Sequence, residues 1–271
     1  MTTWKSPGPA YLFCPADRPE RFAKAAAVAD VVIVDLEDGV APEQRETARA
    51  NVATTDLDPA TTIVRVNPVA SADHDLDMAM LRDSAFSTIM LAKASSADEV
   101  RSLEHFAVVA LCETPAGVSA VEEIAECSNT VGIMWGAEDL VAALGGYSSR
   151  HDDGSYRDVA RYARARTLIA ARAHQLVALD AVYLNFKDLD GQCDEATDAA
   201  AMGFSGTACV HPTQVTVVRE AYRPTSAQVE WAQMVTHGAQ GREGVFQIDG
   251  LMVDGPVLAQ ARQILNRIDQ L

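Results

Sequence analysis

The chain contains eight short apolar runs, separated by stretches of helical composition. Each run is four to six residues long and is rich in Val, Ile, Leu and Ala, with few polar interruptions. Nearly continuous apolarity indicates strands that are covered on both faces, as in a parallel sheet. The runs fall at residues 10–14, 31–35, 62–66, 88–92, 108–112, 132–135, 181–185 and 206–210.

Helical stretches follow these runs in turn, which predicts repeated strand–helix units. "RPERFAKAAAVA" follows the first run and "PEQRETARANVA" follows the second. Alternation of strand and helix implies a parallel sheet. Eight such units in 271 residues fit an α/β fold of the (β/α)8 TIM barrel type, whose usual size is about 250 residues. An open, doubly wound sheet is the alternative.

The pattern changes after the eighth run. Two helices divided at Pro224 are predicted first, then a hairpin in "GVFQIDGLMVD" with Asp249 and Gly250 in its turn, and last a terminal helix. A hairpin and a helix beyond a complete barrel cannot enlarge the barrel core. We therefore divide the chain into a catalytic barrel at 1–220 and a C-terminal extension at 221–271, which covers the barrel mouth or a neighbouring subunit.

Composition narrows the possible partners. The formal net charge of −16 argues against nucleic acid, because phosphate backbones bind basic faces. No run reaches the roughly 18 to 20 apolar residues of a membrane span, and the N-terminus lacks the apolar core of a signal peptide. Five cysteines without a C-x-x-C pair are typical of reduced thiols. We predict a cytoplasmic protein that binds neither nucleic acid nor membranes.

Charged residues follow five consecutive runs, at the point where each predicted strand ends. In a (β/α)8 barrel these ends meet at one mouth, which holds the active site. Crowded carboxylates repel one another unless a cation neutralises them, and oxygen ligands suit Mg²⁺ or Mn²⁺. Arg65 and Lys93 would hold an anionic substrate beside the metal, an arrangement suited to stabilising an enolate. The acids at these ends are Asp35, Glu37, Asp38, Glu113, Glu138 and Asp139.

Several motifs, in their order along the chain, resemble one enzyme family. They are "YLFCPADRPERFAKA", "VVIVDLEDGV", "VRVN", "CETPAG", "GAEDL", "GFSGTACVHPTQ" and "GLMVDGPVLAQA". Together they are similar to the citrate lyase β-subunit-like (CitE-like) proteins of the malyl-CoA lyase and HpcH/HpaI aldolase superfamily. The resemblance implies a (β/α)8 barrel that forms homotrimers or hexamers. It also implies an enzyme that makes or breaks a C–C bond beside a thioester, releasing acetyl-CoA or a related acyl-CoA and a keto acid.

The resemblance assigns roles to residues at the barrel mouth. It implies that Glu113 of "ETPAG" and Asp139 of "GAEDL" are the Mg²⁺ ligands, with Glu113 also bordering the substrate. Arg65 of "VRVN" would contact the substrate carboxylate or the enolate oxygen. Glu37 of "DLEDG" would hold metal-bound water.

Three further residues receive roles from the same resemblance. Arg18 and Lys24, in "FCPADRPERFAK", would contact the phosphates of CoA. Asp254 of "MVDGP" matches an acid that reaches into the site of a neighbouring subunit.

We therefore predict a Mg²⁺-dependent lyase that cleaves or forms a 3-hydroxyacyl-CoA such as citryl-CoA, malyl-CoA or hydroxymethylglutaryl-CoA. Arg65 would stabilise the thioester enolate, and Asp254 would protonate it. One alternative is a metal-dependent aldolase acting on free keto acids, with a Schiff-base variant that uses Lys93 as nucleophile. Another is a subunit of a citrate lyase complex that acts on a carrier-bound acyl group.

Overall fold

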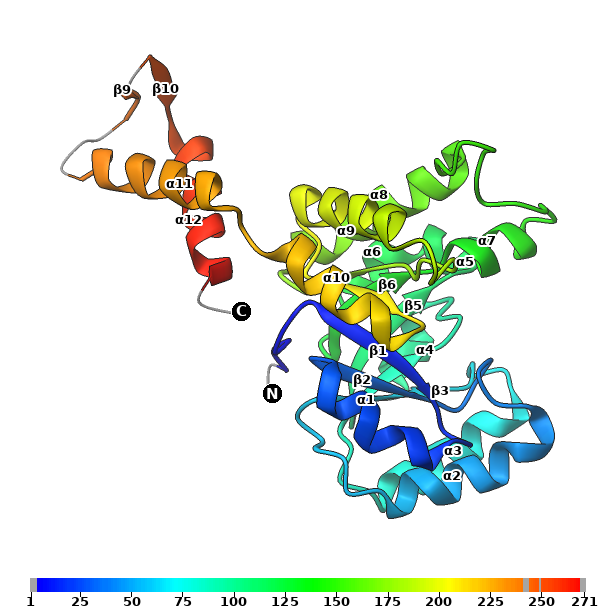
Figure 1. Ribbon diagram of the computed structural model, residues 1–271. Coiled ribbons are helices and arrows are strands. Elements are labelled where there is room, and N and C mark those ends of the chain that lie inside the picture. The colour runs from blue at the N-terminus through cyan, green and yellow to red at the C-terminus, as the bar shows by residue number, and fades with distance from the viewer. Residues whose placement is uncertain (1–3, 241–243, 249, 269–271) are drawn as a thin grey trace.

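Eight parallel strands close into a barrel within the part of the chain that the computed structural model describes, residues 4–240, 244–248 and 250–268. The strands follow sequence order around the barrel, and β8 pairs with β1 to close it. This confirms the predicted (β/α)8 TIM barrel and excludes an open sheet (Figure 1). The strands are β1 (Ala10–Pro15), β2 (Val31–Asp35), β3 (Thr62–Val66), β4 (Thr88–Leu91), β5 (Ala107–Cys112), β6 (Thr130–Trp135), β7 (Val177–Asp180) and β8 (Gly206–Cys209).

Helices follow each strand and cover the outside of the barrel (Figure 1). Several begin at a capping side chain: Ser71, Ser96 and Thr114 each accept a hydrogen bond from a backbone N–H of the first helical turn. The barrel helices are η1 (Pro19–Arg21), α1 (Phe22–Val28), η2 (Pro42–Gln44), α2 (Arg45–Thr54), α3 (Ala72–Arg82), α4 (Ala97–Arg101), α5 (Pro115–Ser119), α6 (Val121–Ala125), α7 (Ala137–Ala143), α8 (Asp158–Ala173), α9 (Leu189–Met202) and α10 (Pro212–Tyr222).

Alternate residues of each barrel strand face the interior and the surrounding helices. On β2, Ile33 belongs to the cluster inside the barrel, whereas Val34 packs in the layer beneath the helices. Because side chains alternate with a period of two, Asp35 points inward again at the carboxyl end of β2. The same alternation directs Arg65 of β3, and Glu113 directly after β5, into the barrel mouth. The strand pattern therefore determines which charged side chains meet there.

The seventh strand lies earlier in the chain than its apolar pattern predicted. The run at 181–185 is wrong as a strand, and β7 covers Val177–Asp180. Asp180 is buried and accepts hydrogen bonds from Trp135 Nε1 at 2.7 Å and from Arg164 Nη2 at 2.7 Å. The Asp180 carboxylate interrupts the apolar run of β7, and its hydrogen-bond partners are distant in sequence. The apolar pattern therefore predicted the strand in the loop that follows, which is more apolar.

The C-terminal extension contains the elements that the sequence predicted. α10 ends at Tyr222, and Pro224 lies in the link to the next helix. Gly250 adopts the left-handed conformation in the hairpin turn, with φ 84°, as glycine does without strain. Asp249, the other predicted turn residue, lies outside the described residues. The elements are α11 (Ser226–Gly238), β9 (Phe246–Ile248), β10 (Leu251–Val253) and α12 (Gly255–Ile268).

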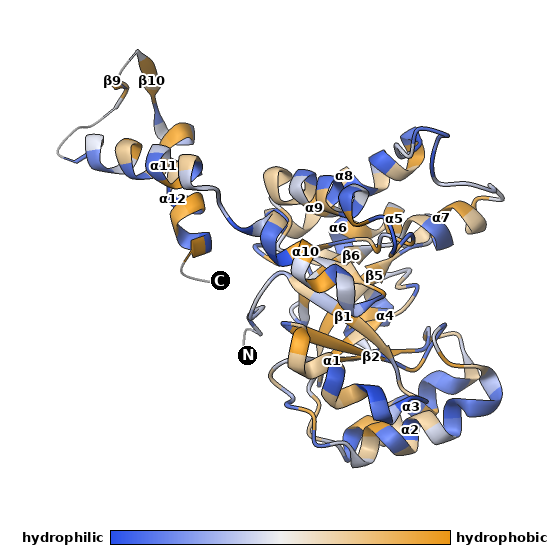
Figure 2. Cartoon of the chain, viewed as in Figure 1, coloured by the Kyte–Doolittle hydropathy of each residue, from blue (hydrophilic) through white to orange (hydrophobic). Residues whose placement is uncertain are grey.

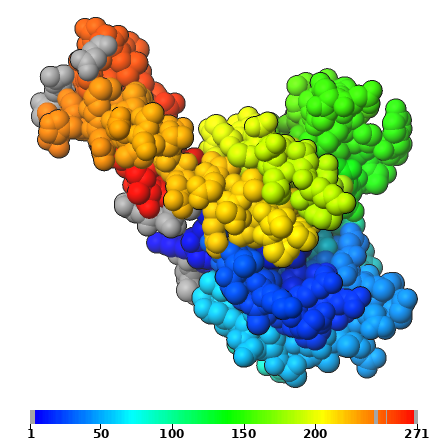
Figure 3. All heavy atoms as spheres, in the orientation of Figure 1, coloured from blue at the N-terminus to red at the C-terminus, as the bar shows by residue number. Residues whose placement is uncertain are grey.

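The extension has its own small core and projects from one corner of the barrel (Figures 1 and 3). Ala232, Val235, Val253 and Ala261 form this core. The orange colour of hydrophobic residues marks β10 and parts of α12 (Figure 2). The extension returns to the barrel through α12, where Arg267 Nη2 donates to the carbonyl oxygen of Ala200 at 2.7 Å.

All five cysteines are free, and four of them are buried. Among the described residues, every helix is too short or too polar to cross a membrane.

Candidate active site

Asp35 and Arg65 form a buried ion pair at the carboxyl ends of β2 and β3, where they are partners in the strand register. Arg65 Nε and Nη2 donate to the two carboxylate oxygens of Asp35, both at 2.6 Å. The same carboxylate accepts the backbone N–H groups of Glu37 at 2.9 Å and Gly39 at 2.8 Å. The Phe13 ring lies 4.8 Å from the guanidinium carbon. Asp35 therefore fixes both the guanidinium group and the "DLEDG" loop.

Lys93, after β4, lies among the remaining acids of the mouth. Its Nζ donates to Glu37 and lies 3.1 Å from Asp38 Oδ2 and 3.4 Å from Asp139 Oδ1. Glu37 also pairs with Arg65 Nη1 at 3.1 Å. Burial lowers the pKa of Lys93, but its hydrogen bond to Glu37 and the nearby carboxylates more than offset this and raise the pKa above the usual value. A lysine held protonated is a poor nucleophile, which argues against the Schiff-base alternative.

Glu113 is the deeply buried acid at the end of β5, with 3% of its surface exposed. Its Oε1 accepts the backbone N–H of Lys93 at 3.2 Å. Its Oε2 lies against Gly136, where an added Cβ would come within 2.6 Å. Burial, followed by the negative charge of Asp139, raises the pKa of Glu113 to about 8. Gly136 therefore makes room for the Glu113 carboxylate. The raised pKa shows that the ionised form of this carboxylate needs more positive charge nearby than the site provides.

A cavity of about 370 Å³ lies in the barrel mouth, and its charged lining residues are Asp35, Asp38, Arg65, Glu113, Glu138 and Asp139. Glu37 and Lys93 do not line it but pair with Arg65, Asp38 and Asp139, which do. Apart from Glu138, five carboxylates surround two cationic side chains, which leaves three negative charges unbalanced if all are ionised. A divalent cation would offset most of this excess. The acids are Asp35, Glu37, Asp38, Glu113 and Asp139, and the cations are Arg65 and Lys93.

Glu113 and Asp139 fit a magnesium ion as a pair. Both line the cavity, and their charges interact strongly enough to raise the pKa of Glu113. Within residues 4–240, 244–248 and 250–268, no three His, Cys, Asp or Glu side chains are grouped so as to hold a metal by themselves. Mg²⁺ usually takes one or two carboxylates and keeps water or substrate oxygens in its other positions. Two carboxylates beside an open cavity satisfy that requirement.

Glu138 has a different environment from its neighbour Asp139. It lies in the first turn of α7, where a negative charge is favourable near the helix dipole. Its Oε1 accepts a hydrogen bond from Ser149 Oγ at 2.6 Å. Glu138 therefore holds the loop before α8, whereas Asp139 contacts Lys93.

Comparison with known proteins gives the family of the chain. The family model of HpcH/HpaI aldolase/citrate lyase matches residues 10–212. The chain belongs to this family. The matched segment runs from the start of β1 to the start of α10, so it covers all eight barrel strands and the residues of the mouth.

Individual relatives match this family member over nearly its whole length. The citrate lyase subunit beta-like protein of Mycobacterium tuberculosis is 52% identical over 263 residues, which are 97% of this chain and 96% of that protein. The mitochondrial citramalyl-CoA lyase of Rattus norvegicus is 31% identical over 294 residues, with coverage of 96% and 85%. The crystal structure of protein CitE from Mycobacterium tuberculosis, in complex with magnesium, acetoacetate and coenzyme A, superposes with a TM-score of 0.93 at 52% identity, with coverage of 97% and 98%.

The structure gathers some of the predicted site residues and separates others. Glu37, Arg65, Glu113 and Asp139 meet at the mouth. Arg65, Glu113 and Asp139 line the cavity, and Glu37 lies next to it, paired with Arg65. The other three predicted residues lie elsewhere. Arg18 and Lys24 are exposed beyond the end of β1, and Asp254 lies between β10 and α12, where its Oδ1 accepts the N–H of Val257 at 3.1 Å.

Sequence reasoning gave no role to Asp35 or Gly136. Asp35 stood among several acids, and only the strand register shows that it is the partner of Arg65. The sequence did contain a sign of this pair, because Asp35 and Arg65 both occupy inward-facing positions in apolar runs. Gly136 directly follows β6 and appeared only as a small residue. Its role depends on the close approach of Glu113 from the neighbouring strand, which a single sequence does not reveal.

Substitution of Asp35 tests the buried ion pair in this family member. Asp35→Ala should lower the free energy of unfolding by about 3–5 kcal/mol, because it removes both hydrogen bonds from Arg65 Nε and Nη2 and leaves Glu37 as the remaining carboxylate beside the buried guanidinium. Asp38→Ala is the control on the same loop. The Asp38 side chain is 57% exposed, so its loss should cost about 1 kcal/mol or less. Urea denaturation measures both values, and equal losses would contradict the role of Asp35.

The raised pKa of Glu113 predicts how the metal-free protein responds to pH. A buried Glu113 keeps its proton in the folded state up to about pH 8, whereas the unfolded chain releases it near 4.5. Its contribution to stability is therefore complete below about pH 4.5 and is lost as the pH rises through about 8. Urea midpoints between pH 5 and 9 should fall less steeply for Glu113→Gln than for the parent protein. Parallel pH profiles would refute this assignment.

Proposed function

We propose that the protein is a Mg²⁺-dependent carbon–carbon lyase that cleaves, or forms, a 3-hydroxyacyl-CoA, with an acyl-CoA and a keto acid as the other side of the reaction. The observation that carries the proposal is the Glu113–Asp139 pair beside Arg65 in the barrel mouth. Membership of the HpcH/HpaI aldolase/citrate lyase family supports it. Further support comes from the relative that binds magnesium, acetoacetate and coenzyme A.

Each mouth residue has a proposed task in this reaction. Glu113 and Asp139 hold Mg²⁺, which when bound supplies a Lewis acid for the oxygens of the keto-acid portion. Glu37 orients water at the metal and shares its charge with Arg65 and Lys93. Arg65 is held by Asp35 and stabilises the negative charge that develops on the thioester enolate oxygen.

The proton balance requires an acid near the thioester. Cleavage transfers the proton of the substrate hydroxyl to a water molecule in the mouth, turns that carbon into a carbonyl and moves the electron pair of the broken C–C bond to the α-carbon of the thioester. That carbon then takes a proton. We propose that Asp254 of a neighbouring subunit donates this proton, because Asp254 matches the position of an acid that reaches into a neighbour's site in similar proteins.

The position of the extension supports action between subunits. α12 meets the barrel beside Ser205, at the amino end of β8, which is the end opposite the mouth. Of the two roles considered for the extension, we therefore propose contact with a neighbouring subunit in a homotrimer or hexamer. The hairpin exposes Val245, Leu251 and Met252, an apolar surface suited to a partner. In this proposal the barrel at 1–220 and the extension at 221–271 form one site from two chains.

CoA recognition is proposed at the exposed start of the first helical segment. Arg18 and Lys24 are exposed beyond the end of β1, from where they would reach the phosphates of CoA, and the nearest carboxylate to Arg18 is that of Asp17, 3.5 Å from Nε. Cytoplasmic localisation also remains a prediction, which the free cysteines support.

The proposal is tested by offering the purified protein several substrates with Mg²⁺. Citryl-CoA, malyl-CoA, citramalyl-CoA and hydroxymethylglutaryl-CoA are compared with the same acids lacking CoA, and the released acyl-CoA is measured by chromatography. We expect cleavage of at least one thioester and none of the free acids. Cleavage of a free acid alone would favour the aldolase alternative. Activity only on an acyl carrier protein would favour a citrate lyase subunit.

A further inference from the structure

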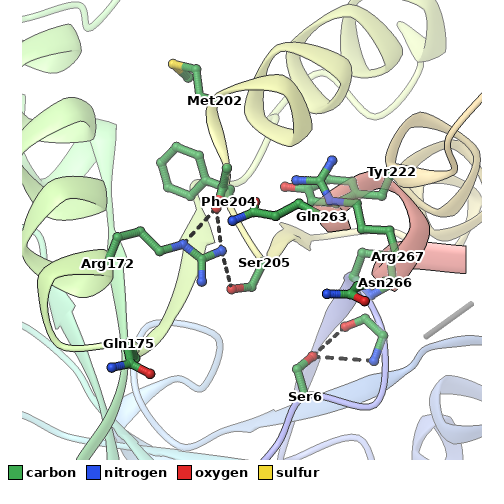
Figure 4. Close-up of a pocket in the computed structure, with 13 residues that line it drawn as sticks. Ser6, Arg172, Gln175, Met202, Phe204, Ser205, Tyr222, Gln263, Asn266 and Arg267 are labelled. Carbon is green, nitrogen blue, oxygen red and sulfur yellow. Dashed lines mark hydrogen bonds between the residues drawn. The ribbon is translucent and has the colours of Figure 1, made fainter. Parts of the chain in front are cut away.

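A second cavity lies between the extension and the barrel, at the amino ends of β1, β7 and β8. Its volume is about 700 Å³. Arg172 and Gln175, from the end of α8 and the loop after it, line one side, and Gln263, Asn266 and Arg267 from α12 line the other (Figure 4). Figure 4 also shows Ser6 below these residues, in the segment before β1. The cavity is therefore formed jointly by the barrel and the extension.

The charge of this cavity is unlike the rest of the molecule. Acidic residues number 38 in the chain, but none of the described residues that line the cavity is acidic. The buried or half-buried Arg65, Arg150 and Arg164 each have a carboxylate partner. The exposed Arg172 and the half-buried Arg267 have no carboxylate within ion-pair distance among the described residues. Partial enclosure, followed by the positive charge of Arg267, lowers the pKa of Arg172.

Arg267 keeps most of its donors available, whereas Arg172 keeps one. Arg172 donates from Nε to the carbonyl oxygen of Gly203 at 2.9 Å, from Nη2 to the same oxygen and to Ser205 Oγ at 3.1 Å, and from Nη1 to the carbonyl oxygen of Leu176 at 3.4 Å. Arg267 makes one hydrogen bond within the described chain, to Ala200. Ala200 and Gly203 lie at the C-terminal end of α9, where a cation is favourable. Capping of α9 explains why each arginine is positioned there, but it does not balance two positive charges that face one cavity.

We propose that this cavity binds a small multivalent oxyanion, with Arg172 and Arg267 as its charged contacts. Guanidinium groups form paired hydrogen bonds with phosphate and carboxylate oxygens, which suits either a polyphosphate or a tricarboxylate. Gln263 and Asn266 add neutral donors from α12. A bound anion bridges α12 and the barrel, and so fixes the extension that carries Asp254. The binding itself does not depend on the proposed function.

Calorimetry with tripolyphosphate and with citrate tests the site, using protein freed of metal on a chelating resin. We expect saturable binding of at least one of the two anions, and the tighter of them identifies the class. Arg172→Gln and Arg267→Gln should each weaken it about 10-fold or more, the value of about one charged hydrogen bond. Gln263→Glu should abolish anion binding, because the new carboxylate neutralises the positive charge of the cavity and repels an anion. Arg262→Gln removes an exposed charge from the same helix and should leave the binding unchanged.

Three results would overturn the proposal. The first is the absence of saturable binding of either anion to the parent protein. The second is equal binding by Arg267→Gln and the parent, or an equal loss in Arg262→Gln. The third is a parent protein that binds neither anion, together with arginine variants whose oligomeric mass differs from that of the parent. That result would mean that the cavity binds an acidic segment of a second copy of the chain. Thermal melting of each variant shows whether it is folded. Gln263→Glu should raise the melting temperature, because its carboxylate offsets the repulsion between Arg172 and Arg267, so its loss of anion binding would not be due to unfolding.

Discussion

Asp139→Asn is expected to lower kcat/KM for the thioester substrate by about 10²- to 10⁴-fold, since Lewis-acid stabilisation by a bound metal is worth several kcal/mol. The substitution removes one of two proposed ligands but changes neither size nor shape. It also relieves the repulsion that raises the pKa of Glu113. The variant should therefore fold normally and need far more Mg²⁺ for half-maximal activity.

The adjacent acid provides the matched control for this prediction. Glu138→Gln removes the same charge one residue earlier, but its side chain is engaged by Ser149. It should retain activity within about 10-fold and keep the parent Mg²⁺ requirement, as expected for a residue that tunes its surroundings without ligating the metal. If the effects of the two substitutions were reversed, Glu138 would replace Asp139 as the proposed ligand.

Asp254→Asn is expected to lower kcat by about 10²- to 10⁴-fold, which is the usual contribution of a positioned general acid. Asn also accepts hydrogen bonds at the start of a helix, so the contact with Val257 and the fold of α12 should remain. Binding of Mg²⁺ and of the keto acid should not change. A variant with normal kcat would exclude Asp254 as the proton donor.

The same substitution also tests whether two chains share one site. Asp139→Asn and Asp254→Asn are each nearly inactive in this proposal, but they damage different chains of the shared site. Refolding the two variants together should recover a measurable fraction of activity, because some sites then combine an intact barrel with an intact extension. Recovery would be absent if Asp254 served only the barrel of its own chain.

The barrel could be predicted from the sequence because each strand has a local pattern. Apolar runs fix the strands, and the period of two then directs Asp35, Arg65 and Glu113 into the mouth. The seventh strand was misplaced because Asp180, a buried carboxylate, is stabilised by Trp135 and Arg164 from other elements. A local hydropathy pattern reflects the unfavourable burial of a charged residue, but it contains no information on distant residues that stabilise the charge.

The site was predictable in residue type but not in its pairing. Sequence reasoning placed Arg65 and Lys93 together as contacts for an anionic substrate. The structure instead engages Lys93 with Glu37 and Asp38, and Arg65 with Asp35. Which acid meets which cation depends on strand register and loop conformation, and these are set by the packing of the whole barrel.

In the extension, too, the sequence predicted the helices and strands but not their position relative to the barrel. Its helices and hairpin follow from turn residues and apolar spacing, and the structure confirms them. The sequence left open whether it covers its own barrel mouth or reaches another chain. The contact of Arg267 with Ala200 attaches α12 to α9, away from the mouth, a position that no local pattern encodes.

The most direct test of the central claim is to measure metal binding and thioester cleavage on the same sample. Metal-stripped protein is titrated with Mn²⁺, which is followed by electron paramagnetic resonance while acyl-CoA release is assayed at each point. We expect no cleavage without metal, activity that rises in proportion to one bound ion per chain, and loss of both signals in Asp139→Asn. Full cleavage by metal-free protein, or normal Mn²⁺ binding by Asp139→Asn, would contradict the central claim.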